Sequence, residues 1–109
     1  MRIWDIPPKQ LCRPHLLDEH RELHAIWTVL TQNKKGYSKH PETLRWVGAL
    51  SALFIRHQKL VQEMVKRGYH HLSPLNEQLA RGRKRQTKFV DSLERQRQIL
   101  FKKGCKCKL

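Results

Sequence analysis

The sequence predicts an all-α fold, a compact single-domain bundle of three main helices with an extended N-terminal arm. Apolar residues recur at spacings of three and four along three segments, as the buried face of a helix requires. No stretch alternates apolar and polar residues in the way that a half-buried strand does. A chain of 109 residues that is 39% hydrophobic can form one small core. We therefore expect a single domain over residues 1–109, with an arm (1–13), a helical body (14–103) and a short tail (104–109).

The N-terminal segment combines a helix-breaking arm with a strong helix signal. Pro7 and Pro8 remove two backbone donors and favour an extended path. Pro14 suits the first turn of a helix, and apolar spacing continues from there to Leu30. We predict a first helix over about residues 14–31, followed by a polar break at 32–36.

The second predicted helix begins at Pro41 and ends at Arg67, where Gly68 supplies a left-handed stop. Its apolar residues form two adjoining stripes, so we expect a central helix that packs on both sides. One stripe contains Val47, Phe54, Val61 and Val65, and the other contains Trp46, Leu50, Leu53, Leu60 and Met64.

The last third of the chain predicts a connector and a third helix. Ser73-Pro74 opens a short turn that ends near Gly82, and a helix follows over about residues 87–103. The expected inner face of this helix contains Phe89, Val90, Leu93, Ile99 and Leu100.

The charge is strongly positive, with 23 Lys and Arg against 9 Asp and Glu, a formal charge of +14. A large positive charge favours an anionic polymer such as nucleic acid as the partner. The sequence has no apolar run long enough to span a membrane and no apolar stretch after its first residues to act as a secretory signal. We therefore expect a soluble, intracellular protein with no membrane contact. Three cysteines, an odd number, are most simply reduced thiols.

One group of side chains in the first predicted helix has catalytic potential. His15 and Glu22 are two turns apart, and Arg21 is next to Glu22. A carboxylate flanked by these groups could act at a phosphodiester or a glycosidic bond. A solvated helix face with ordinary ion pairs is the alternative, and the spacing alone favours it.

The histidines and cysteines raise the question of a metal. His20 and His24 are one turn apart, Cys12 lies upstream, and Cys105 and Cys107 lie at the end of the chain. This spacing is poor for a structural zinc site, and His20 lies on the apolar stripe, where a core histidine is more common than a ligand. We expect neither a metal nor an organic cofactor. A small zinc-dependent regulator would require the cysteines to converge with histidines.

Several enzyme classes have no support in the sequence. It contains no Gly-rich phosphate loop, no Gly-x-Ser-x-Gly elbow and no His-Glu-x-x-His helix. One nucleophile remains, the N-terminal α-amine. Its reference pKa is about 7.7 to 8.0, against about 10.4 for lysine, so part of it is unprotonated at neutral pH and can form an imine. Because Arg2 is too bulky for removal of the initiator residue, the amine is expected to belong to Met1.

These residues resemble the pyrimidine-dimer DNA glycosylase/AP lyase family of the phage endonuclease V type. The resemblance rests on three segments: residues 1–3, His15-Leu-Leu-Asp-Glu-His-Arg-Glu-Leu23, and Lys66-Arg-Gly-Tyr69. It implies an all-helical domain that bends DNA, with catalysis by the N-terminal amine and a glutamate. By position, Met1 and Glu22 are the catalytic residues, and Arg2, His15 and Arg21 hold DNA or shape the site. The chain departs from the family at Ala25, where an arginine is expected, and in its Cys-Lys-Cys-Lys-Leu ending.

The combined prediction is a DNA-repair glycosylase with AP lyase activity by β-elimination. Its partner is double-stranded DNA that contains a damaged base, such as a pyrimidine dimer, or an abasic site. We expect a monomer that is cytoplasmic and associates with the nucleoid when bound to DNA. Arg83, Lys84, Arg85 and Lys88 are expected to hold the flanking phosphates. The alternative is a non-catalytic, basic, helical nucleic-acid-binding protein.

Overall fold

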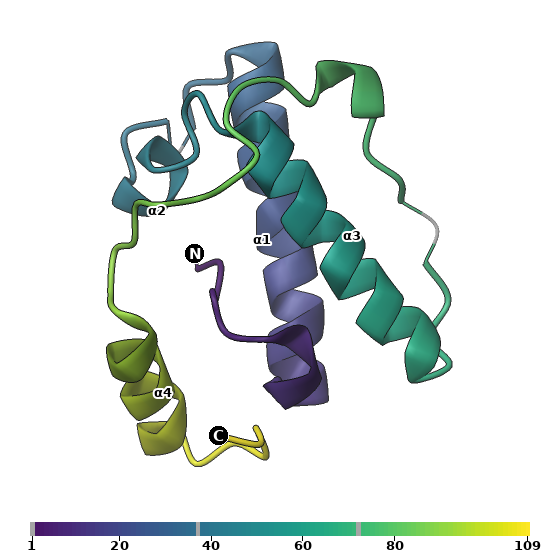
Figure 1. Ribbon diagram of the computed structural model, residues 1–109, viewed down its shortest axis with the longest axis vertical. Helices are drawn as coiled ribbons and strands as arrows, with labels where there is room; N and C mark the ends of the chain where they lie inside the picture. Colours follow the sequence, from purple (N-terminus) through teal and green to yellow (C-terminus); the bar gives the residue numbers. More distant parts are fainter. Residues whose placement is uncertain (1, 37, 72) are drawn as a thin grey trace.

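A computed structural model describes residues 2–36, 38–71 and 73–109, and this part of the chain is helical without a strand (Figure 1). The all-α prediction is therefore confirmed. The elements in chain order are η1 (Pro8–Gln10), α1 (Arg13–Gln32), α2 (Pro41–Leu44), α3 (Leu50–Lys66), η2 (Glu77–Leu79) and α4 (Leu93–Lys102). None of the described helices is long and apolar enough to cross a membrane.

α1 follows the sequence prediction closely. Pro14 lies in its first turn, where a missing N–H costs no helical hydrogen bond. Asn33 ends the helix in the left-handed conformation, and its N–H donates to the Val29 carbonyl. α1 packs against α3, and the two cross with their apolar faces together.

The predicted helix over 41–67 is wrong as one continuous element. Gly48 adopts a φ of +74°, and the chain turns between α2 and α3. This turn brings Trp46 into the core, whereas Val47 is 54% exposed. Along α3, Leu53, Leu60 and Met64 are buried and Val65 is exposed. The stripe through Trp46 and Met64 therefore faces the core. Of the other stripe, Phe54 packs against the edge of the core beside Trp27, whereas Val47 and Val65 are exposed.

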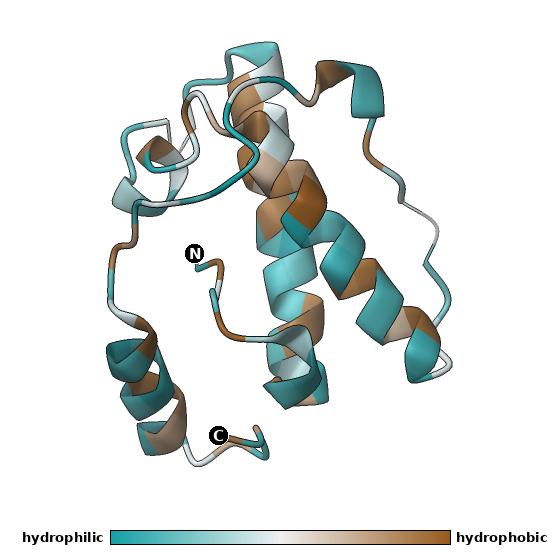
Figure 2. Ribbon diagram, viewed as in Figure 1, coloured by the Kyte–Doolittle hydropathy of each residue, from teal (hydrophilic) through white to brown (hydrophobic). Residues whose placement is uncertain are grey.

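The third predicted helix begins six residues later than expected, at Leu93. The Ser92 hydroxyl accepts a hydrogen bond from the Arg95 N–H, and this cap sets the start of α4. Phe89 and Val90 therefore lie in a non-helical, exposed segment, and only Leu100 of the predicted inner face is fully buried. Figure 2 shows the chain as hydrophilic where it passes beside α2 and as partly hydrophobic just before α4.

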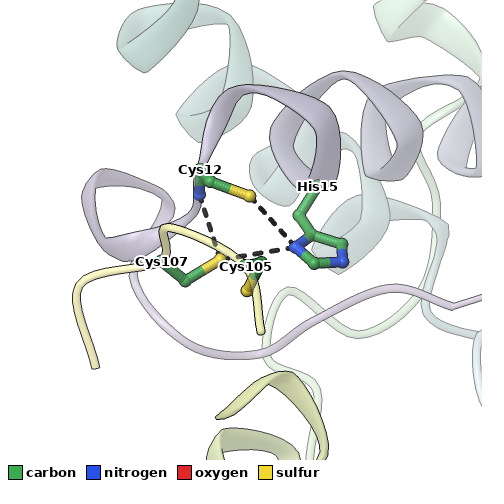
Figure 3. A group of neighbouring side chains, drawn as sticks. All are labelled: Cys12, His15, Cys105 and Cys107. Carbon is green, nitrogen blue, oxygen red and sulfur yellow. Dashed lines mark hydrogen bonds between the residues drawn. The ribbon is translucent and has the colours of Figure 1, made fainter. Parts of the chain in front are cut away.

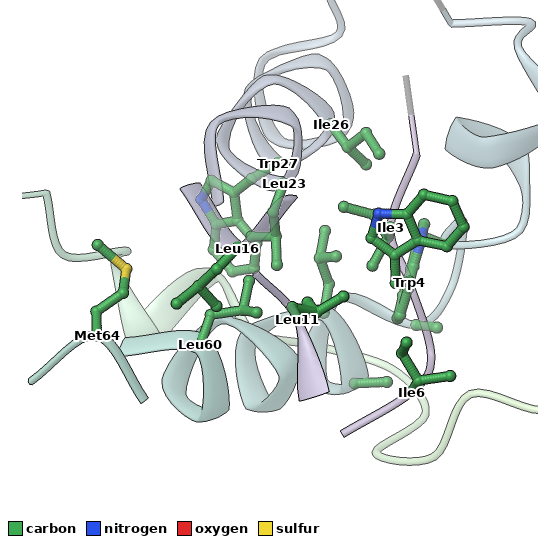
Figure 4. Packing of buried hydrophobic residues seen from close by; sticks show 14 of the residues in the cluster. Ile3, Trp4, Ile6, Leu11, Leu16, Leu23, Ile26, Trp27, Leu60 and Met64 are labelled. Atoms are coloured by element: carbon green, nitrogen blue, oxygen red, sulfur yellow. The ribbon is translucent and has the colours of Figure 1, made fainter. Parts of the chain in front are cut away.

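The N-terminal arm is part of the core. Ile3, Trp4, Ile6 and Leu11 are buried in the same hydrophobic cluster as residues of α1 and α3. Figure 4 shows arm side chains lying against the apolar face of α1. Burial of this kind contributes about 1.5–3 kcal/mol for each large apolar side chain, so the arm is held by packing along most of its length.

Candidate active site

A buried ion pair fastens the arm to α1 and α3. The Glu19 carboxylate on α1 accepts hydrogen bonds from Arg56 Nε at 2.7 Å and Arg56 Nη2 at 3.0 Å. It also accepts the Trp4 backbone N–H at 3.1 Å, and Arg56 Nη1 donates to the Ile6 carbonyl at 2.9 Å. Burial raises the pKa of Glu19, and the Arg56 guanidinium opposes that shift. The arm therefore crosses α1 at the turn that precedes Glu22.

A second buried guanidinium joins the arm to the segment before α4. Arg45 donates to the Ile3 carbonyl at 2.9 Å, to the Lys88 carbonyl at 3.0 Å and to Asp5 Oδ1 at 3.1 Å. Its Nε donates to Glu42 Oε1 at 2.7 Å. Sequence analysis missed Glu19, Arg45 and Arg56 as positioning residues, because a charged residue on a helix usually faces solvent.

The residue next to the N-terminus is also held in place. Arg2 pairs with Asp91 at 2.7 Å, and its guanidinium lies 5.0 Å from the centre of the Trp4 ring. Arg2 therefore has a protein partner in addition to any role toward phosphates. The predicted nucleophile, Met1, lies outside the described residues.

Glu22 differs from the other acidic groups of α1. Its side chain is half-buried, and within the described chain it makes no hydrogen bond or ion pair. Glu19 is buried against Arg56, and Asp18 pairs with the exposed Arg21 at 3.1 Å. Because residues three apart share a helix face, Glu22 lies one turn beyond the carboxylate that holds the arm. Ordinary surface ion pairing thus accounts for Asp18 and Arg21 but leaves Glu22 available for chemistry.

The predicted phosphate-binding residues occupy an exposed segment anchored beside the start of α3. Arg83, Lys84, Arg85 and Lys88 are all exposed. The Arg83 N–H donates to the Gly48 carbonyl, and the Arg83 carbonyl accepts the Ala52 N–H, both at 2.9 Å. Backbone hydrogen bonds therefore hold the segment while its cationic side chains reach solvent.

A second basic surface was not predicted. A cleft of about 880 Å³ lies between η1, the start of α1, the end of α3 and the C-terminal tail. Arg67 closes one side by donating to the Leu11 carbonyl at 2.6 Å. The basic residues lining the cleft are Lys9, Arg13, Lys66, Arg67, Lys106 and Lys108. The Lys66-Arg67-Gly68-Tyr69 segment of the family resemblance contributes to this wall.

His15 lies against the three thiols of the chain (Figure 3). Its Nδ1 atom is 3.1 Å from Cys12 Sγ and 3.4 Å from Cys107 Sγ, and Cys105 completes the group. Burial lowers the pKa of His15, with a further contribution from Lys103. The convergence that the zinc hypothesis required is therefore present. Cys12 and His15 have two residues between them, a spacing that sequence analysis overlooked because it paired Cys12 with His20 and His24.

Four other histidines form a separate group. His20 and His24 of α1 meet His57 of α3 and His71 of the following connector. The Nε2 atom of His24 is 3.2 Å from those of His20 and His57, and that of His71 is 3.0 Å from that of His20. Burial and the neighbouring imidazoles lower the pKa of His20 to about 4. His20 is therefore a neutral member of a polar cluster, and sequence analysis missed His57 and His71.

A basic all-α domain with a buried arm beside a half-buried carboxylate fits a DNA-processing enzyme. The family model described as pyrimidine dimer DNA glycosylase matches residues 1–77, which include the arm, α1, α2 and α3. The chain therefore belongs to the pyrimidine dimer DNA glycosylase family, a family of DNA-repair glycosylases that act on damaged DNA. No curated protein and no solved structure matches the chain. The matched region contains four of the predicted site residues, Arg2, His15, Arg21 and Glu22. The basic residues at 83–88 and the cysteines Cys105 and Cys107 lie beyond it.

Proposed function

We propose that this protein cleaves the glycosidic bond of damaged pyrimidines in duplex DNA and then cuts the strand by β-elimination, through an imine between the deoxyribose and the α-amine of Met1. The observation that carries the proposal is the Glu22 carboxylate, half-buried and without a partner among the described residues. It lies one turn from the Glu19 carboxylate that holds the Trp4 N–H. The arm at Trp4 therefore lies one helical turn from Glu22, which supports a reaction between groups at these two places.

The proposed chemistry has three stages: displacement of the base, formation of an imine, and β-elimination. The unprotonated amine attacks C1′ of the damaged nucleotide, the glycosidic bond breaks, and the base leaves with its bonding electrons and takes up a proton. Opening of the sugar ring gives an imine, which makes the C2′ proton acidic. Loss of that proton expels the 3′ phosphate and leaves a cut strand. Water then hydrolyses the imine, which releases the unsaturated sugar aldehyde and frees the Met1 amine. Glu22 stabilises the cationic sugar and imine and moves the protons at C2′ and the ring oxygen.

DNA is held by surfaces separate from the reacting groups. The exposed Arg83, Lys84, Arg85 and Lys88 contact phosphates that flank the lesion, and Arg21 contacts a phosphate close to Glu22. Arg2 keeps its pairing with Asp91 and orients the first residues of the arm. Asp91 therefore holds the Arg2 side chain in place without a contact to a DNA phosphate.

The first test uses duplexes with an abasic site or a cyclobutane dimer, incubated with and without borohydride. We expect a trapped covalent adduct at Met1. Glu22→Gln retains the size but loses the charge, so it should bind the duplex as well as the parent and cut it about 10²–10⁴-fold more slowly. Glu77→Gln is the matched control, because Glu77 is exposed on η2 and should be dispensable. Unchanged cutting by Glu22→Gln would contradict the role of this residue.

The second test places two extra residues before Met1. Each adds about 3.5 Å of chain, more than a near-attack geometry can absorb, so cutting should be largely lost while duplex binding is retained. Full activity of the extended protein, or an adduct at an internal lysine, would rule out the N-terminal mechanism. Duplex binding without any adduct or cutting in the parent protein would support the non-catalytic alternative.

A further inference from the structure

We propose that this protein binds two structural zinc ions, one at Cys12, His15, Cys105 and Cys107, and one at His20, His24, His57 and His71. Each group brings four ligand atoms within 4.8 Å of one another. The two groups share no residue, and the geometry of each supports its own site. Neither site belongs to the catalytic proposal for Met1 and Glu22.

The thiol site has the donor set of a closed zinc centre. Three cysteine sulfurs and one imidazole nitrogen form a Cys₃His group, which is a common structural zinc set. With Zn–S about 2.3 Å and Zn–N about 2.0–2.1 Å, a tetrahedral ion separates neighbouring S and N ligands by about 3.5 Å. His15 Nδ1 lies 3.1 and 3.4 Å from the sulfurs of Cys12 and Cys107.

Backbone contacts support the thiol site. The Cys12 N–H donates to Cys107 Sγ at 3.1 Å, a bond that stabilises a metal-bound sulfur. The Lys108 N–H donates to the Gln10 carbonyl at 2.7 Å, and this hydrogen bond holds the tail beside the arm. None of the three cysteines forms a disulfide. An ion here would tie the C-terminal tail to the first turn of α1.

The four histidines of the second site cannot all satisfy their mutual contacts by hydrogen bonds. The close contacts run in a chain from His71 to His20, His24 and His57, always between Nε2 atoms. A neutral imidazole Nε2 either donates one hydrogen bond or accepts one. Neutral histidines can therefore satisfy at most two of the three contacts. A cation that accepts all four lone pairs satisfies every ring at once.

The distances and the outer contacts fit the same ion. A tetrahedral zinc ion with Zn–N of about 2.0–2.1 Å separates its nitrogens by about 3.3 Å. The three close contacts between Nε2 atoms are 3.0–3.2 Å, and all four ligand atoms lie within 4.8 Å of one another. His57 Nδ1 lies 2.8 Å from Gln58 Oε1, to which it can donate, leaving Nε2 free for a metal. Zinc takes four nitrogen ligands in a tetrahedral arrangement, whereas Cu²⁺ prefers a tetragonal one, so we assign zinc to this group of four imidazoles.

Both sites are structural because each supplies four protein ligands and leaves no position for a reacting water. The histidine site would join α1, α3 and the connector at His71, and the thiol site would join α1 to the tail. His15 would then be a zinc ligand, and its expected role toward DNA would fall away. Metal binding of this kind contributes directly to the free energy of folding.

The test begins with metal analysis of the full chain, prepared without an affinity tag and exchanged into metal-free buffer. We expect about two zinc ions per chain and about one in either His71→Gln or Cys107→Ser. His70→Gln is the matched control, because His70 is the exposed neighbour of His71 and lies outside the cluster. Cys107→His keeps a zinc-binding side chain at the thiol site and should restore the second ion.

A second measurement keeps the proposal testable where a variant does not fold. Co²⁺ added to the metal-free parent protein should saturate two sites, and only the thiol site should give a thiolate-to-cobalt charge-transfer band. The parent protein must show this band and lose it when zinc is added. A chain free of metal after refolding with zinc would overturn the whole proposal. Equal metal loss in His70→Gln and His71→Gln would overturn the histidine site, and a disulfide found by mass spectrometry in the freshly prepared protein would overturn the thiol site.

Discussion

Gly82→Ala should strongly destabilise the protein, because the backbone of Gly82 lies directly against the backbone of Gly48. Gly82 has a φ of +85°, and a Cβ atom built on it collides with the Gly48 carbonyl. Ala49 and Gly82 form an isolated antiparallel bridge at this point. Since the obstacle is backbone, a rotamer change cannot relieve the collision.

The expected loss follows from two contributions. A positive φ costs a residue with a Cβ atom about 1–2 kcal/mol. Opening the bridge also removes three hydrogen bonds: Arg83 N–H to Gly48, Ser51 N–H to Arg81, and Ala52 N–H to Arg83. At about 0.5–1.5 kcal/mol each, these bonds add about 1.5–4.5 kcal/mol. The total loss in the free energy of unfolding is therefore about 2.5–6.5 kcal/mol.

Urea unfolding followed by circular dichroism measures this loss. Gly104→Ala is the matched control, because Gly104 has a φ of +65° but no atom within 4 Å of the added Cβ. It should lose only about 1–2 kcal/mol. Equal losses in the two variants would refute the close contact of residues 82 and 48, and with it the placement of the basic segment beside α3.

Two further predictions concern the core and the DNA surface. Leu53→Ala should cost about 2–5 kcal/mol in urea unfolding, because Leu53 is fully buried. Val65→Ala is the control and should cost less than about 0.5 kcal/mol, because Val65 is 60% exposed. Similar costs in the two variants would mean that the inner face of α3 is misplaced. Neutralising Arg83, Lys84 and Arg85 together should flatten the log–log dependence of duplex affinity on salt by about two to three units. Neutralising the exposed Lys34, Lys35 and Lys39 provides a control of equal charge, and an equal change in slope would remove the 83–85 segment from a special role in binding.

The sequence predicted the helices where local signals are complete, and it failed where the decisive contact is distant. α1 has Pro14 at one end, a polar break at the other and continuous apolar spacing between them. The break between α2 and α3 depends on Gly48, whose turn is stabilised by the Arg83 N–H from far along the chain. The late start of α4 had a local signal in Ser92, but the apolar Phe89 and Val90 outweighed it.

The candidate site shows the same division. Glu22 and Arg21 were identified from a short motif and its distance from the N-terminus, which are properties of the sequence alone. Glu19, Arg45 and Arg56 could not be assigned, because the sequence does not show which charged side chains become buried. Their roles depend on arm carbonyls and N–H groups that reach α1 and α3 only after the arm has packed into the core.

The proposed metal sites show most clearly which ligands lie close together in the sequence and which are brought together only by the fold. Each contains a pair visible in the sequence, Cys12 with His15 and His20 with His24, and both pairs are on or beside α1. The remaining ligands come from α3, the connector and the tail. α1 and its N-cap residue Cys12 therefore supply half of each proposed ligand set, and α1 also carries the carboxylate that holds the arm and the proposed catalytic Glu22. The histidine site would attach the connector to α1, and the thiol site would attach the tail. Loss of one metal ion should therefore loosen one of these segments and leave the other in place, so each site is tested with its own variant.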